Sequence, residues 1–108
     1  RITAVGANGA ATAAMLKGGA HQAATGEHAV LVACRQADVI LGPLGIVVAD
    51  ALLGEISPDM AIAVGQSRAR KILLPIDRCN TLVVGVGDYS LSALLECALE
   101  ELGRLLEG

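Results

Sequence analysis

One loop of the sequence gathers four chemically different side chains in consecutive positions. Asp77, Arg78, Cys79 and Asn80 supply a carboxylate, a guanidinium, a thiol and an amide directly after an apolar run. Arg78 could pair with a phosphate or carboxylate, and Asn80 could donate to the same group. Cys79 would be a nucleophile if the arginine lowered the pKa of its thiol. A polar hairpin turn with a half-buried cysteine accounts for the same residues, so the loop leaves both interpretations open.

Two glycine-containing turns also follow apolar runs, Gly6 to Gly9 and Gly42 to Gly45. In open α/β sheets such turns lie beyond the carboxyl ends of the strands, where backbone N–H groups and helix N-termini reach an anion. Neither turn is a complete G-x-G-x-x-G or phosphate-binding loop, and glycine also serves tight turns and close packing. The expected ligand-binding residues are Gly6, Asn8, Gly9, Gly42, Pro43, Gly45, Asp50, Arg78 and Asn80.

Asp50 stands alone among these residues, because it is a carboxylate inside an apolar stretch. It could face solvent, or it could point into the cleft and accept a hydrogen bond from a ribose hydroxyl. We expect the ligand to be a small molecule, with a nucleotide or dinucleotide as the candidate cofactor. No catalytic base accompanies Cys79, which is therefore the sole and weak catalytic candidate.

Cysteine and histidine usage argues against a metal centre and a disulfide framework. The three cysteines, Cys34, Cys79 and Cys97, are an odd number without C-x-x-C spacing. Cys34 falls on the expected buried face of a helix, which indicates packing. His21 and His28 alone do not make a metal site. A reducing, cytoplasmic compartment suits this pattern.

Composition excludes two classes of partner. A net charge of −3 opposes broad attraction to phosphate backbones, and Tyr89 is the only aromatic residue on which a base could stack. Nucleic acid is therefore not an expected partner. The apolar runs are interrupted long before the eighteen or so residues that a bilayer span requires, so no membrane segment is expected. The 108 residues have room for a single domain.

The elements that must position these residues alternate between strand and helix. Ser57 and Pro58 are a strong helix start, and Thr25 and Ser90 are expected as N-caps of two other helices. Short apolar runs without alternation are typical of strands covered on both faces of a parallel sheet. The expected order is strand 2–5, helix 10–17, helix 25–37, strand 38–41, helix 46–53, helix 58–70, strand 71–76, strand 81–86 and a final helix from residue 90.

These elements predict an α/β fold of Rossmann-like, three-layer type with a mostly parallel sheet. Four residues, 77–80, cannot form a parallel crossover, so strand 81–86 is expected to be an antiparallel edge strand. The last helix carries a wide leucine face. That face is expected to pack on the sheet, and it could extend into a subunit interface of a homo-oligomer.

Five segments, in this order, resemble a small bacterial family of unknown function that is common in clostridia-like anaerobes: 5–8, 24–27, 42–46, 53–58 and 74–80. The likeness spans nearly the whole chain. It implies a Rossmann-like fold, no assigned reaction, and a further strand, glycine-rich turn and helix ahead of residue 1. The chain would then be truncated at its amino end and supply half of a cleft. The family commonly has Asn where this chain has Asp77.

These observations favour a nucleotide- or small-anion-binding module with a regulatory or accessory role. The first alternative is an enzyme, either a nicotinamide-linked oxidoreductase or a transferase that uses Cys79. The second is an oligomeric structural protein that assembles through the leucine face of its last helix.

Overall fold

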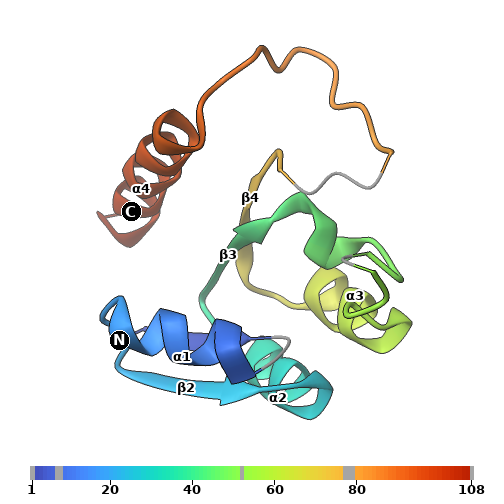
Figure 1. Ribbon diagram of the computed structural model, residues 1–108. Helices are drawn as coiled ribbons and strands as arrows, with labels where there is room; N and C mark the ends of the chain where they lie inside the picture. The colour runs from blue at the N-terminus through green and yellow to red at the C-terminus, as the bar shows by residue number, and fades with distance from the viewer. Residues whose placement is uncertain (1, 7–8, 52, 77–79, 108) are drawn as a thin grey trace.

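The computed structural model describes residues 2–6, 9–51, 53–76 and 80–107 of the chain. Within these residues it is a mixed α/β protein with small parallel sheets and four α-helices (Figure 1). The elements, in chain order, are β1 (Thr3–Gly6), α1 (Gly9–Lys17), β2 (Gln22–Thr25), α2 (Glu27–Gln36), β3 (Val39–Pro43), the 3-10 helix η1 (Leu44–Val47), α3 (Pro58–Gln66), β4 (Arg70–Leu74) and α4 (Leu91–Glu107).

The strands form two separate parallel pairs. β1 pairs with β2, with Thr3 opposite Gln22, and β3 pairs with β4, with Val39 opposite Arg70. Parallel neighbours need a crossover of a dozen or more residues, which α1 supplies for the first pair and η1 with α3 for the second. The prediction of parallel strands is therefore confirmed, although no strand is shared between the two sheets.

The helices lie on two sides of these strands. α2 and α3 pack against each other, α1 packs on β1 and β2, and α4 packs on β4 (Figure 1). Ser90 precedes the first residue of α4 and caps the helix, because its side-chain oxygen accepts a hydrogen bond from the N–H of Ala93 at 3.2 Å. Ser57 caps α3 in the same way, so both predicted serine caps are confirmed.

The core is built from small and medium aliphatic side chains. Ala51, Ile56, Met60 and Ala61 form its buried cluster, and Val30, Ile46 and Val48 pack against it half-buried. Cys34 is buried, which confirms its predicted packing role. Within the described part of the chain, no large side chain is completely buried.

The predicted start of the second helix is wrong. Thr25 is the last residue of β2, and the N-cap of α2 is Gly26, whose φ of 96° lies in the left-handed region. The strand escaped prediction because it is only four residues long and contains Ala23 and Ala24, which have a high helix propensity. α3 also ends earlier than predicted, at Gln66.

The predicted helix over 46–53 is also wrong. The 3-10 helix ends at Val47, and the chain then turns with Asp50 and Leu53 at φ values of 64° and 58°. The N–H of Asp50 donates to the carbonyl of Ile56 at 2.7 Å, closing a loop that buries Ile56. Burial in the core has overridden local propensity here.

The predicted antiparallel strand over 81–86 does not form in the described residues. The segment 80–90 contains turns and extended chain, with a turn at Gly85, whose φ is 89°. Leu82 and Val84 are almost fully exposed. The apolar composition that favoured a strand is insufficient without a pairing edge and a face to cover.

Candidate functional site

The carboxyl ends of the strands define the candidate site. Because the strands of each pair are parallel, Gly6 and Thr25 end together, and so do Pro43 and Leu74. The helices α1, α2 and η1 each begin close after one of these strand ends. We call these strand ends the carboxyl edge. Ligands of open parallel sheets bind at this kind of edge.

Two hydrogen bonds fix the end of β2, one to β1 and one to α1. The N–H of Gly26 donates to the carbonyl of Gly6 at 3.0 Å, and the hydroxyls of Thr12 and Thr25 lie 2.6 Å apart. Thr12 belongs to the α1 helix, so this contact fixes that helix against the end of β2. The sequence did not indicate this pair, because it depends on the undetected strand β2.

The starts of α2 and α3 are joined by a polar contact at the same edge. Ser57 accepts from the N–H of Met60 at 3.2 Å and donates to the carboxylate of Glu27, the first residue of α2. A carboxylate between two helix N-termini compensates the partial positive charge of both. An external anion would therefore compete with Glu27 at this point.

The predicted second glycine turn has a packing explanation at Gly42. A Cβ at this position would lie 3.0 Å from Cδ1 of Ile46, closer than side chains normally approach. Glycine lets η1 fold back over the end of β3. Pro43 is the last residue of β3 and the N-cap of η1, and Gly45 is buried inside η1. These three residues support a tight turn at the carboxyl edge.

The first glycine turn is different at Gly9. This residue starts α1, is exposed, and has open space where a Cβ would be. Packing therefore does not demand glycine at this position. Gly6 is buried at the end of β1, so the two glycines differ in environment. Asn8 lies outside the described residues.

Asp50 and Asn80 are exposed, and both have left-handed backbones, with φ values of 64° and 61°. Within the described part, no hydrogen bond joins either side chain to the glycine turns. Arg78 and Cys79 lie outside the described residues. The structure thus places each glycine turn at the end of a strand, and it describes the polar loop that follows β4 only at Asn80.

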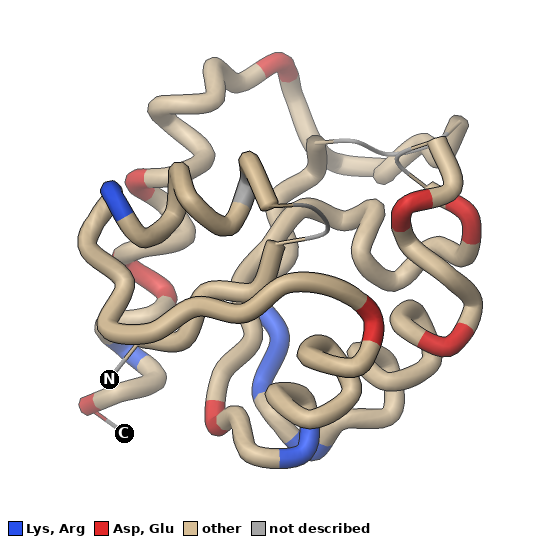
Figure 2. The backbone as a smooth tube through the Cα atoms, turned by 60° about the horizontal axis from the view of Figure 1, so that its bottom comes forward, with Lys and Arg blue, Asp and Glu red and all other residues tan. Residues whose placement is uncertain are grey.

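Charge is unevenly distributed around the molecule. Glu27 and Asp59 lie in the first turns of α2 and α3, and Asp50 and Glu55 lie in the turn before α3. Figure 2 shows acidic and no basic residues among the described residues along its right-hand side. Among the described residues, the carboxyl edge therefore carries no cation for an anionic ligand.

A separate hollow lies between α2 and α3. A groove of about 520 Å³ runs between α2 and α3 and is lined by residues near the ends of both helices, including Cys34, Arg35, Gln66 and Arg68. Burial raises the pKa of the Cys34 thiol, although the Lys71 ammonium opposes the shift. A protonated thiol is a weak nucleophile, so the groove does not contain an activated cysteine.

The described residues contain no group of three side chains able to hold a metal ion, and no helix with the length and apolar character needed to cross a bilayer. Cys34 and Cys97 are free thiols.

Fold and site together define a mixed α/β protein with parallel strand pairs and glycine turns at their carboxyl edge. Residues 1–107 match the domain of unknown function DUF3842, so the chain belongs to that family. Comparisons with curated proteins and with solved structures find no match.

Proposed function

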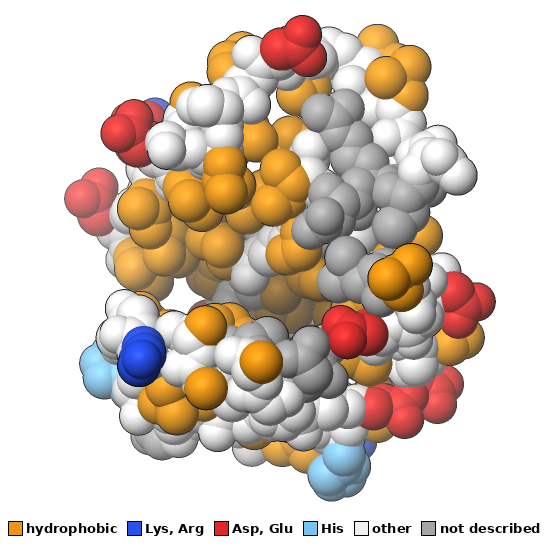
Figure 3. Space-filling model, in the orientation of Figure 1, with side chains coloured by type: hydrophobic (Ala, Val, Ile, Leu, Met, Phe, Trp, Pro, Cys, Tyr) orange, Lys and Arg blue, Asp and Glu red, His pale blue; other side chains and the backbone are white. Residues whose placement is uncertain are grey.

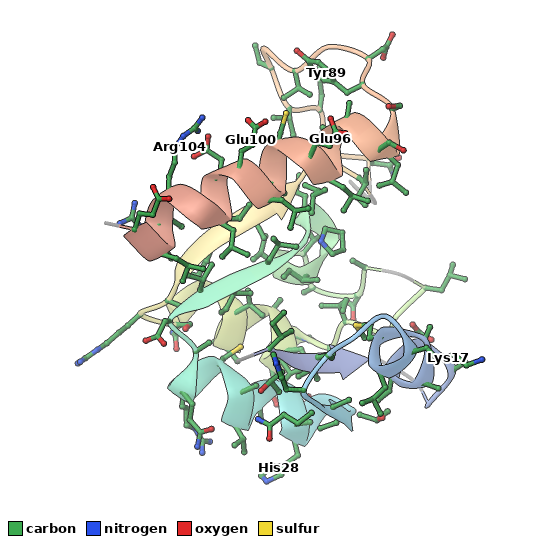
Figure 4. The ribbon with its side chains drawn as sticks, turned by 90° about the vertical axis from the view of Figure 1, so that its left-hand side faces the viewer. Lys17, His28, Tyr89, Glu96, Glu100 and Arg104 are labelled. Carbon is green, nitrogen blue, oxygen red and sulfur yellow. The ribbon has the colours of Figure 1, made fainter. Side chains whose placement is uncertain are left out.

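We propose that this protein is a Rossmann-like module that binds a nucleotide or another small anionic molecule at the carboxyl edge. The supporting observation is the direction of the crossovers. β3 lies nearer than β4 to the β1–β2 pair (Figure 4), so α1, which leads from β1 to β2, and α3, which leads from β3 to β4, run in opposite directions across the molecule. The point where crossovers diverge is the usual ligand position in parallel sheets.

Within this edge, the start of α1 is the favoured contact for the anionic group. Its first turn contains no acidic residue, whereas Glu27 already compensates the starts of α2 and α3. The open space at Gly9 lets a ligand approach the first N–H groups of the helix. In this proposal, Arg78 supplies the positive charge that pairs with the anionic group of the ligand. Asp50 accepts a hydrogen bond from a sugar hydroxyl.

Gly9→Ala tests this proposal. The new methyl group would meet no atom of the described residues within 4 Å, so we expect folding to be maintained while the methyl group occupies the space outside the first turn of α1. Gly65→Ala is the matched control, because Gly65 is also helical and exposed, and a methyl group there would likewise meet no protein atom. Isothermal calorimetry with ATP, NAD⁺, coenzyme A and inorganic phosphate provides the readout.

At least one of these molecules should bind, and Gly9→Ala should weaken it about tenfold or more, equivalent to about 1.4 kcal/mol. Gly65→Ala should bind like the unmodified protein. Absence of binding by all four molecules, or equal binding by the two variants, would contradict the proposal.

A further inference from the structure

A hydrogen bond of Ser67 joins the loop between α2 and β3 to the loop between α3 and β4. The Ser67 hydroxyl donates to the carbonyl of Cys34 at 2.7 Å. Both loops lead into the starts of β3 and β4, so they lie at the opposite end of these strands from the carboxyl edge. Because Cys34 and Ser67 are bonded, the residues that follow them, Arg35 and Arg68, come together and line the groove between α2 and α3.

Both of these arginines are exposed and lack a partner in the described part of the chain. The one ion pair among the described residues joins Arg104 to Glu101 on α4, and no side-chain hydrogen bond of Arg35 or Arg68 accompanies it. A guanidinium carries five donors in a planar fork that matches a carboxylate or a phosphate. Two such groups at one end of a groove are suited to hold an anionic group.

Compensation of the helix dipoles does not account for both arginines. Cations are favoured near helix carboxyl ends, and Arg35 lies in the last turn of α2. The Lys71 ammonium, however, already lies 2.9 Å from the carbonyl of Ser67 and 3.4 Å from that of Ala69. The Ser67 hydroxyl already satisfies the carbonyl of Cys34. These contacts leave the guanidiniums available for a ligand.

The distribution of charge favours an anion at this end of the strands. The chain has a net charge of −3 and eight basic residues, and four of them are Arg35, Arg68, Arg70 and Lys71. Figure 2 shows basic positions grouped at the bottom of the view, away from the acidic right-hand side. An anion that approaches the groove is therefore attracted there and repelled from the starts of α2 and α3.

The remainder of the groove is mostly apolar. Its lining includes Leu31, Ile62 and Ala63, and Ile62 is 51% exposed. The volume of about 520 Å³ falls within the usual range of about 300–1,000 Å³ for small-molecule sites. The hollow between α1 and α4 in Figure 3 is also lined by hydrophobic side chains, but no group of cations is visible among the described residues around it. Only the groove between α2 and α3 combines the two properties within the described structure.

Asp59 gives the groove a direction. This residue lines the groove from the first turn of α3, seven residues before Gln66 at the end of the helix. Two helical turns place the two positions about 10 Å apart along the helix axis. A second anionic group near Asp59 would be repelled, so a ligand that fits has its anionic group at the arginine end only.

We propose that this groove binds a small amphipathic anion. A phosphate or carboxylate pairs with Arg35 and Arg68, and an apolar body lies along Ile62 toward the start of α3. The site is separate from the carboxyl edge, and the inference does not depend on the function proposed there.

Octyl phosphate is a suitable probe, because it joins one anionic group to one apolar chain. Calorimetry at concentrations where it stays monomeric should show binding at least about tenfold tighter than that of inorganic phosphate or octanol, each of which offers only one of the two contacts. In NMR spectra the amide signals of Ser67 and Arg68 should shift on binding, whereas that of Gly9, at the carboxyl edge, should not.

Two matched pairs of substitutions test the two halves of the ligand. Arg35→Gln and Arg68→Gln should each weaken binding of octyl phosphate about tenfold, through loss of charged hydrogen bonds. Arg104→Gln removes the same charge from α4 and should bind like the unmodified protein. Ile62→Ser should weaken binding about fivefold, whereas Leu99→Ser, which alters another exposed side chain, should have no effect.

Absence of binding, an equal affinity for inorganic phosphate, or equal losses in the variants and their controls would overturn the proposal. Binding only to vesicles of phosphatidic acid would identify a lipid surface, and binding only to a glutamate-rich peptide would identify a protein segment, and either result would also overturn it. Gly9→Ala should leave the binding of octyl phosphate unchanged, so this proposal and the proposed function fail or survive separately.

Discussion

Ser57 and Glu27 connect the starts of two helices through one hydrogen bond. Ser57 donates to the Glu27 carboxylate while it caps α3 by accepting from the N–H of Met60. Thirty residues separate the two partners in sequence. The contact therefore ties the crossover helix α2 to α3 at the carboxyl edge, beside the expected ligand position.

This connection predicts non-additive stability. Ser57→Ala should cost about 1 kcal/mol through loss of the cap. Glu27→Gln should cost less, because Glu27 is exposed, and the two losses should couple by about 0.5 kcal/mol because they share one interaction. Urea unfolding of both single variants and the double variant measures the coupling. Strictly additive losses would show that the contact has no energetic role.

The positive φ of Gly26 predicts opposite outcomes for two glycine-to-alanine changes. Gly26→Ala should destabilise the protein by about 1–3 kcal/mol, because alanine is strained in this backbone conformation. Gly65→Ala, within α3, should stabilise it by up to about 1 kcal/mol through helix propensity. Thermal unfolding followed by circular dichroism compares them. Equal shifts of the two midpoints would contradict the backbone argument.

The close approach of Gly42 to Ile46 predicts a rescue. Gly42→Ala should lower stability by about 1–3 kcal/mol, because the new Cβ would lie 3.0 Å from Cδ1 of Ile46. Ile46→Val removes that carbon, so the double variant should recover part of the loss. Denaturant unfolding of all three variants provides the test. If Ile46→Val made Gly42→Ala worse, glycine would be required there for another reason.

Cys34 should be slow to alkylate at neutral pH, because burial raises the pKa of its thiol despite Lys71. Mass spectrometry after iodoacetamide treatment should find Cys97, which is exposed, modified before Cys34. Because the pKa of the Cys34 thiol is higher in the folded than in the unfolded chain, its protonation stabilises the fold. This contribution is complete below the unfolded-state pKa of the thiol and is lost as the pH rises through its folded-state pKa. Stability should therefore fall in the alkaline range, and less so in Cys34→Ala.

Local signals in the sequence predicted much of the fold. Ser57 with Pro58 and Ser90 marked two helix starts because capping depends only on neighbouring residues. The turn at Asp50 could not be predicted in this way, since it follows from the burial of Ile56 in a distant core. β2 was missed because its register with β1 outweighs the helix preference of its alanines.

The candidate site was predicted only in part. The glycine turns lie at the carboxyl edge as expected, because parallel strands place their ends together. The sequence could not reveal that Ile46 lies close to Gly42, which depends on how η1 folds back. Nor could it indicate that Glu27 would reach Ser57, since that contact requires α2 and α3 to pack side by side.

The separation of the sheets has a consequence for folding cooperativity. β1 closes on β2 over 19 residues, as the Thr3 to Gln22 contact shows, while β3 must close on β4 over a longer loop that contains η1 and α3. Loop-closure entropy therefore favours the first pair as the earlier folding unit. Neither sheet supplies a pairing edge for the other. The α2 helix packs on β1, β2 and α3, so it is the element that links the stability of the two sheets. A destabilising substitution in α2 should therefore separate a single unfolding transition of the protein into two.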